Sequence, residues 1–164
     1  MIKDVWINLP VKDLSKSVLF YEGIGLVRKP GPGNAEKSAC FAIGEKNVVL
    51  MLFAEQAFAG FTNNPLVDCS KGTEVLFSVG VEKRAQIDEL AKRAESAGGK
   101  VFSEPRESNG FMHGCGLMDP DGHRWNALYM DYSEMPNSRT VPTCQDNART
   151  RNERLARYSP ALNE

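Results

Sequence analysis

Alternating apolar residues mark two stretches of the chain, one near the N-terminus and one near the middle. The apolar positions of the two stretches are Val5, Ile7, Leu9 and Val11, and then Val75, Phe77, Val79 and Val81. Such alternation is typical of a β-strand with one buried face, because successive side chains point to opposite sides of a sheet. The pattern predicts strands over residues 5–11 and 75–81. Pro10 has no backbone N–H, so we expect its end of the first strand to be an edge or a terminus.

A helical pattern follows each of these strands. Its apolar positions are Leu14, Val18 and Tyr21 after the first strand, and Ile87, Leu90, Ala91 and Ala94 after the second. That spacing predicts amphipathic helices that pack one side against a sheet. Asp13 is placed to cap the first helix, Gly23 and Gly25 are expected to end it, and Gly98 and Gly99 to end the second.

Shorter apolar runs predict the remaining strands. They cover residues 39–43, 48–53, 101–104, 110–118 and 125–130. Segment 28–38, which is rich in Gly, Pro and polar residues, is expected to form a loop. Segment 54–72 is expected to form a long connection, and connections of that length often serve as lids or join modules.

A tight turn precedes the last predicted strand, in the sequence DPDGHRWNALYMD at residues 119–131. Pro120 presets φ, Gly122 tolerates φ > 0, and the aspartates can bond to their own backbone. We therefore interpret Asp119 and Asp121 as turn formers rather than an acid–base pair, and His123 as structural. The strand that follows places alternate residues on its two faces: Trp125, Ala127 and Tyr129 on one, and Asn126, Leu128 and Met130 on the other.

The two halves of the chain share one order of elements, which is strand, helix, then further strands. The apolar strands at Val5 and Val75 lie 70 residues apart, which indicates an internal duplication. The predicted fold class is α+β, with two βαβββ modules that form a curved mixed-sheet cup. The predicted boundaries are 1–60 for the first module, 61–72 for a linker, 73–132 for the second module and 133–164 for a C-terminal extension. A short helix is predicted at 143–158 in that extension.

Composition narrows the class of protein. A net charge of −1 and a pI of about 6.2 argue against a nucleic-acid or polybasic membrane partner. The N-terminus has no signal-peptide pattern, and no apolar run is long enough to span a membrane. The four cysteines, Cys40, Cys69, Cys115 and Cys144, form no C-x-x-C motif, so we expect reduced thiols and a cytoplasmic protein.

Three motifs then point to a family. NLPVKDLSKSVLFYEGIGL, TEVLFSVGVEKRAQIDELAKRAESAGG and NGFMHGCGLMDPDGHRWNALYMD resemble, in order and spacing, the vicinal oxygen chelate superfamily. That superfamily includes glyoxalase I, extradiol dioxygenases and bleomycin-resistance proteins. The resemblance covers roughly residues 3–132, and within the superfamily these motifs are most similar to the lactoylglutathione-lyase-like branch. The resemblance implies the paired βαβββ fold and a homodimer, with modules paired within a chain or swapped between chains.

The resemblance also identifies four positions that bind a divalent metal in the metalloenzymes of the superfamily. In this chain they are Trp6, Met51, Leu76 and Asn126. Zinc, nickel and iron prefer imidazole, carboxylate or thiolate ligands, and none of these four side chains supplies one. The sequence therefore predicts no metal cofactor, and a small-molecule binding protein in the manner of the bleomycin-resistance proteins.

Six residues are predicted to bind the ligand, and of these Asn8 and Asn126 are expected to point towards the concave face of the cup. The six residues are Trp6, Asn8, Met51, Leu76, His113 and Asn126. The alternative is a glyoxalase-like lyase or isomerase, or a dioxygenase-related enzyme, with Glu74 and His113 as candidate catalytic residues. A His113–Cys115 pair is a further catalytic candidate, although residues two apart on a strand lie too far apart for a direct hydrogen bond. A third reading is a scaffold whose arginine-bearing tail, 133–164, docks a partner.

Overall fold

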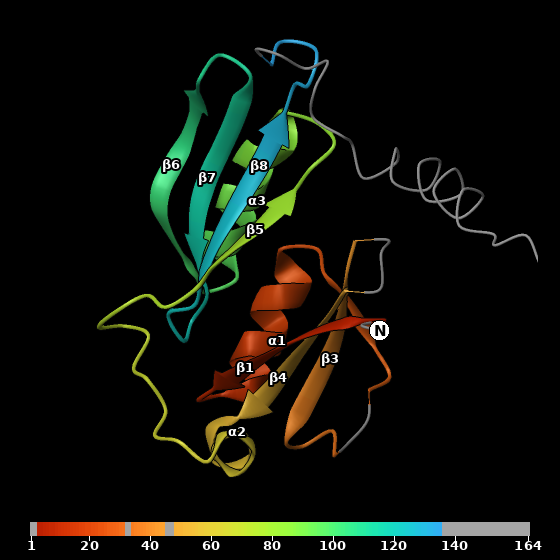
Figure 1. Cartoon of the computed structure of the whole chain (residues 1–164), viewed down its shortest axis with the longest axis vertical. Coiled ribbons are helices and arrows are strands. Elements are labelled where there is room, and N and C mark those ends of the chain that lie inside the picture. Colours follow the sequence, from red (N-terminus) through yellow and green to blue (C-terminus); the bar gives the residue numbers. More distant parts are fainter. Residues whose placement is uncertain (1–2, 32–33, 45–47, 136–164) are drawn as a thin grey trace, which may run out of the picture. The chain divides into compact units, whose positions relative to one another are not determined.

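The computed structural model describes residues 3–31, 34–44 and 48–135, and these residues form eight strands and three helices (Figure 1). Residues 131–164 form a unit of their own, separate from residues 1–130. The helix predicted at 143–158, and nearly all of the arginine-bearing tail, lie outside the described residues. None of the helices in the described part is long and apolar enough to cross a membrane.

The first module contains four strands and one helix that covers them. Its elements are β1 (Val5–Val11), α1 (Leu14–Gly23), β2 (Val27–Lys29), β3 (Ser38–Ile43) and β4 (Val48–Ala54). In this described part the strand order is β1-β4-β3-β2, with β1 parallel to β4 and the other pairs antiparallel. Asp13 caps α1 as predicted, because its carboxylate accepts a hydrogen bond from the backbone N of Lys16 at 3.1 Å.

The second module repeats the first. Its elements are β5 (Leu76–Gly80), α3 (Ala85–Ser96), β6 (Lys100–Ser108), β7 (Met112–Met118) and β8 (Arg124–Met130). The order β5-β8-β7-β6 has the same directions as the first sheet, and β5 is parallel to β8. The predicted α+β fold with two βαβββ modules is confirmed. Across the described residues the strands form two separate four-stranded sheets, so β1 and β5 each remain an edge strand.

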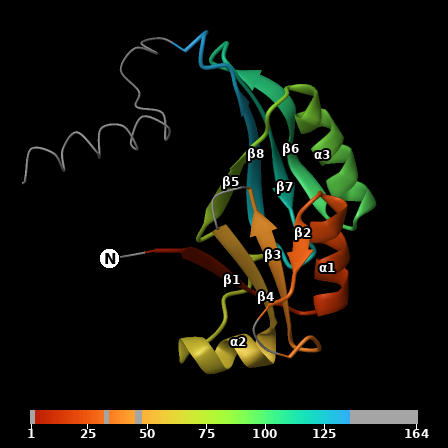
Figure 2. The same ribbon diagram turned by 90° about the vertical axis from the view of Figure 1, so that its right-hand side faces the viewer.

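Each sheet has one face covered by a helix, and we call the other face the open face. Leu9 and Val11 of β1 pack in the same apolar cluster as Tyr21 of α1, while Trp125 and Ala127 of β8 join it from the second module. Figure 2 shows α1 and α3 on one side of the strands, and the two helices contact each other. Alternation therefore assigns the remaining residues of β1 and β8 to the open face, and these include Trp6, Asn8 and Asn126.

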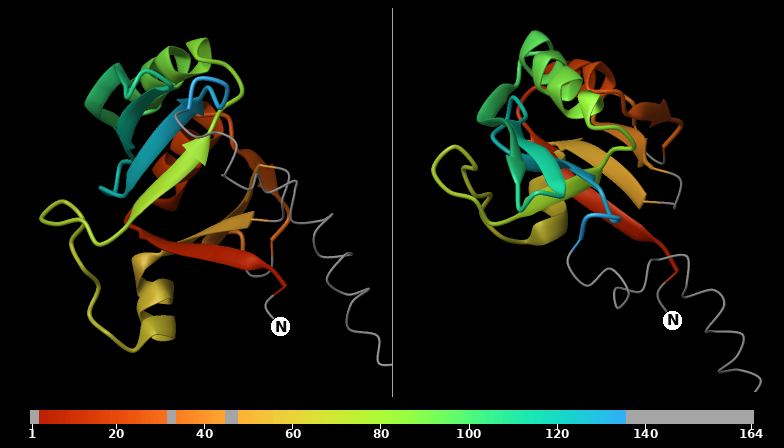
Figure 3. Two further views of the ribbon diagram at one scale, coloured as in Figure 1. Left: turned by 45° about the horizontal axis from the view of Figure 1, so that its top comes forward. Right: turned by 90° about the horizontal axis from the view of Figure 1, so that it is seen from above.

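Two elements appear where the sequence predicted connections. Within the predicted connection 54–72 lies α2 (Glu55–Thr62), which has no side-chain cap and no buried residue. Figure 3 shows α2 on the side of β1 and β4 away from α1, where the rings of Phe61 and Phe53 lie 5.0 Å apart. The predicted loop 28–38 begins with β2, whose three residues are all exposed. Neither element has the buried periodic face on which the prediction depends.

β6 is longer than the strand predicted at 101–104. It continues through Pro105 to Ser108, and its register with β7 shifts between Ser103 and Arg106. A proline removes a backbone donor and is tolerated at an edge strand or at an irregularity in pairing. β6 is the outer strand of the described sheet, so it satisfies both conditions.

Candidate functional site

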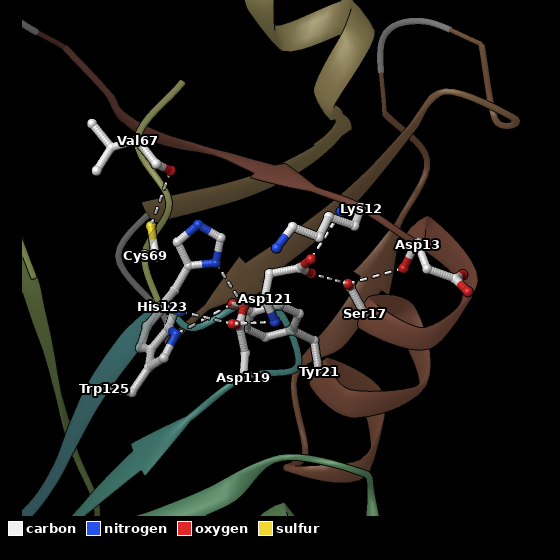
Figure 4. Close-up of polar contacts among 10 residues, drawn as sticks. All are labelled: Lys12, Asp13, Ser17, Tyr21, Val67, Cys69, Asp119, Asp121, His123 and Trp125. Carbon is white, nitrogen blue, oxygen red and sulfur yellow. Dashed lines mark hydrogen bonds and ion pairs between the residues drawn. The ribbon is translucent and has the colours of Figure 1, made fainter. Parts of the chain in front are cut away.

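The turn before β8 holds a carboxylate that is almost fully buried (Figure 4). Asp119 is 2% exposed, and its Oδ1 accepts hydrogen bonds from the backbone N of Asp121 at 3.0 Å and of His123 at 2.8 Å. Its Oδ2 accepts from the hydroxyl of Tyr21 at 2.7 Å and lies 2.8 Å from Nδ1 of His123. The backbone bonds confirm the interpretation of Asp119 as a turn former. Tyr21 adds a contact with the first module that the local pattern did not reveal.

The second carboxylate of the turn also reaches the first module. Asp121 Oδ1 accepts a hydrogen bond from the backbone N of Lys12 at 2.9 Å, and its Oδ2 accepts from Ser17 Oγ at 2.8 Å. Ser17 Oγ also lies 3.0 Å from the backbone carbonyl of Asp13, to which it can donate instead. The turn is therefore attached to the start of α1 by two bonds that span more than a hundred residues of sequence. We call Tyr21, Asp119, Asp121, Ser17 and their partners the inter-module network.

Burial raises the pKa of Tyr21 well above its usual value, and the nearby Asp119 carboxylate acts in the same direction. The neutral hydroxyl also accepts a hydrogen bond from Nε1 of Trp125 at 3.2 Å. Tyr21 is thus held as a neutral hydrogen-bonding group at physiological pH. Its role in this network is to join the modules.

The four positions that the superfamily resemblance identifies lie on the open faces, at equivalent points of the duplicated sheets. Asn8 of β1 is opposite Met51 of β4, and Ser78 of β5 is opposite Asn126 of β8. Trp6 lies two residues before Asn8 on β1, and Leu76 lies two residues before Ser78 on β5. The duplication thus favours Leu76 over Glu74, which precedes β5, as the counterpart of Trp6.

The predicted open-face residues differ in exposure. Trp6 is 50% exposed and Leu76 is 52% exposed, whereas Met51 is 1% exposed. Asn126 is half-buried, and Asn8 is exposed. The open faces therefore present apolar side chains beside two amide groups. The side chains at the four superfamily positions do not fit a zinc, nickel or iron ion, because they offer one thioether, one amide and two groups without a donor atom for such a metal. Nor does the described part of the chain bring three or more His, Cys, Asp or Glu side chains together in a way that could hold a metal ion.

His113 lies on the helix-covered face, away from Asn126 and the other open-face residues, and its part in ligand binding stays a prediction. Its Nε2 is 3.6 Å from Asp88 of α3, and neither ring nitrogen has a hydrogen-bond partner among the described residues. Cys115 lies on the same face, and its Sγ contacts the carbonyl of Ile87 at 3.8 Å. Burial raises the pKa of the Cys115 thiol to about 11, so it is not a thiolate at neutral pH.

A cavity of about 390 Å³ lies where β1, the segment after α2 and the turn before β8 meet. We call it the junction cavity. Two of the predicted site residues, Asn8 and Glu74, line it together with Phe58, His123 and Arg124. Met51 lines a different cavity of about 430 Å³, and a third cavity of about 530 Å³ contains none of the predicted residues.

Arg124 was not among the predicted site residues, although strand alternation offered a signal for it. It lies two residues before Asn126 and therefore on the same open face. Its guanidinium carbon is 4.4 Å from the centre of the Phe102 ring. The residues that line the junction cavity thus include one arginine, one glutamate and two asparagines among many apolar side chains, which is the usual composition of a small-molecule site.

Comparison with known proteins identifies the family. A sequence model of the Glyoxalase/Bleomycin resistance protein/Dioxygenase superfamily matches residues 5–127. The chain belongs to this superfamily, as the motifs and the paired βαβββ modules predict. No curated protein matches the chain.

Solved structures agree with this assignment. A hypothetical protein from S. aureus is 33% identical, with a TM-score of 0.69, and the match covers 79% of this chain and 95% of that one. A glyoxalase-related enzyme from Fulvimarina pelagi is 19% identical, with a TM-score of 0.66 and coverage of 79% and 88%. TnmS3, an antibiotic binding protein from Streptomyces sp. CB03234, is 18% identical, with a TM-score of 0.57 and coverage of 80% and 98%. The last two likenesses concern the fold alone.

Proposed function

We propose that this protein binds a small molecule against its open faces and in the junction cavity, without a resident metal ion. The observation that carries the proposal is the identity of the four superfamily positions, which are Trp6, Met51, Leu76 and Asn126. An exposed tryptophan and leucine suit contact with a flat apolar ligand, and an amide suits orientation of a polar group. That one fold neighbour is an antibiotic binding protein agrees with a binding role.

We further propose that the protein forms a homodimer. β1 and β5 are edge strands in the described part, and four apolar residues at or next to their first residues are about half exposed: Val5, Trp6, Val75 and Leu76. Unpaired edges and exposed apolar residues are hazards that association covers. Size-exclusion chromatography with light scattering tests this, and a monomer at all accessible concentrations would contradict it.

The binding proposal is tested by a thermal-shift screen of protein stripped of metal with a chelator. A ligand that binds only the folded form raises the free energy of unfolding by mass action, by about 2.7 kcal/mol at a ligand concentration 100 times Kd. The melting temperature rises accordingly. We expect at least one small planar metabolite to stabilise the stripped protein, and Trp6→Ala to weaken that effect. Stabilisation only after a divalent metal is restored would contradict the metal-free proposal.

The position of Glu74 supports a second candidate, a glyoxalase-like lyase or isomerase. Its carboxylate lines the junction cavity and is available as a proton acceptor there. Turnover of the methylglyoxal–glutathione hemithioacetal by the purified protein would support this candidate, and Glu74→Gln would then abolish turnover. Turnover that survives Glu74→Gln would exclude Glu74 as its base.

A further inference from the structure

Arg124 combines a fixed position with unused hydrogen-bonding capacity. Its guanidinium lies over the ring of Phe102, and its Nε is buried without a hydrogen-bond partner among the described residues. Stacking on an aromatic ring holds one face of the planar group and leaves its edges free to donate. A buried donor without an acceptor destabilises the protein, so a ligand that supplies the acceptor gains affinity.

The local structure explains how Arg124 comes to be held in this way. The ring of Phe102 of β6 lies against Gly116 of β7, where a Cβ atom on Gly116 would come within 2.5 Å of the ring. Only glycine leaves space for the ring at that point of the sheet. The ring in turn lies beside the first residue of β8, which is Arg124. Gly116, Phe102 and Arg124 therefore act together as a support for one guanidinium on the open face.

No carboxylate neutralises this guanidinium in the part of the chain that the structure describes. The acids of the neighbouring turn are already engaged, since Asp119 and Asp121 accept hydrogen bonds from the inter-module network. Glu74 lines the same cavity without an ion pair to Arg124. The junction cavity thus offers an unpaired arginine edge at one point and a carboxylate at another.

We propose that the ligand of the junction cavity carries an anionic group, a carboxylate or a phosphate, which Arg124 binds through the edge of its guanidinium. The inference rests on the proposed binding function and adds the chemical class of the ligand. Arginine suits these groups because its planar set of donors matches two oxygens of a carboxylate or phosphate at once.

The test compares three probes of similar size by NMR titration of 15N-labelled protein: benzoate, phenyl phosphate and the neutral benzamide. We expect one of the anions to bind at least about tenfold more tightly than benzamide, a difference of about 1.4 kcal/mol. The anion that binds more tightly distinguishes carboxylate from phosphate. Chemical shifts of Asn8 and Glu74 amides report binding in the junction cavity itself.

Three variants assign the preference to Arg124. Arg124→Gln should abolish it, and Arg124→Lys should retain only part of it, because lysine keeps the charge and loses the planar donor edge. Arg106→Gln is the matched control: it removes an exposed cation from the same sheet, outside the junction cavity, and should leave the preference unchanged. Circular dichroism of each variant reports whether it is folded.

The possible failures are distinguishable. Equal binding of anions and benzamide, or a preference that survives Arg124→Gln, would overturn the inference and leave the proposed binding function standing. If none of the three probes binds, both the inference and the junction cavity as a ligand site are contradicted.

Discussion

Replacing Tyr21 with phenylalanine removes one hydroxyl group from the contact between the two modules. That hydroxyl donates to Asp119 at 2.7 Å and accepts from Trp125 at 3.2 Å, and the side chain is fully buried. A hydrogen bond to a charged group contributes about 1.5–3 kcal/mol, and a buried donor left without an acceptor costs about 1–3 kcal/mol. Asp119 keeps its three other partners, and the ring keeps its aromatic neighbours. We therefore expect the free energy of unfolding to fall by about 2–4 kcal/mol.

Urea denaturation, followed by tryptophan fluorescence and circular dichroism, measures this change. For a chain of this size each kcal/mol lowers the melting temperature by roughly 3–4 °C, so a thermal scan should show a decrease of about 6–16 °C. Tyr132→Phe is the matched control, because Tyr132 is 56% exposed and the same substitution there should cost less than about 0.5 kcal/mol. A Tyr21→Phe variant within about 0.5 kcal/mol of the wild type would refute the stabilising role of the inter-module network.

Two further predictions follow from the raised pKa values. The folded protein keeps the Tyr21 proton to a higher pH than the unfolded chain, so the stabilisation by the Tyr21 hydroxyl is complete below about pH 10 and is lost as the pH rises towards the folded pKa. The difference in urea midpoint between wild type and Tyr21→Phe should therefore narrow above about pH 10. A difference that stays constant up to about pH 11.5 would contradict this prediction. Burial raises the pKa of the Cys115 thiol to about 11, so this thiol should resist iodoacetamide at about pH 7.5 in the native protein and react after unfolding in urea. Peptide mass spectrometry measures the labelling, and rapid labelling of the native protein would contradict the burial of Cys115.

The pattern of the sequence predicted the strands and helices that have a buried face. Residues such as Val11 and Ile87 are fully buried, and alternation or helical spacing records that burial directly. The repeat of the pattern then predicted the second module. α2 and β2 left no such record, because α2 buries no residue and all three residues of β2 are exposed. Their positions depend on tertiary contacts such as that between Phe53 and Phe61.

The candidate site was less accessible to prediction than the fold. Alternation assigned Trp6 and Asn126 to the open faces, and it gave His113 the same face as Cys115, but it did not reveal that this face is buried against α3. The partners of the DPDG turn lie about a hundred residues earlier, and no local pattern connects Asp119 with Tyr21. The junction cavity depends on the path of the segment after α2, which no periodicity describes.

This chain has the superfamily fold but departs from the superfamily at the four metal positions. A fold carries no function by itself, so the proposed metal-free binding depends on the side chains at the four positions rather than on the superfamily. Trp6 and Leu76 at the two first strands are the most informative, because neither side chain has a donor atom for a divalent ion. Placing histidines at both positions, with Trp6→His and Leu76→His, would test whether the identity of these two side chains is what prevents metal binding.

Metal analysis of the purified native protein decides whether the protein binds its ligand without a metal ion. The protein is expressed without a polyhistidine tag in medium that contains nickel, zinc and iron, and its metal content is measured by mass spectrometry before and after dialysis against a chelator. We expect far less than one metal ion per chain, and ligand-dependent stabilisation that the chelator leaves unchanged. A metal ion bound at one per chain or per dimer, whose removal abolishes ligand binding or turnover, would contradict this expectation.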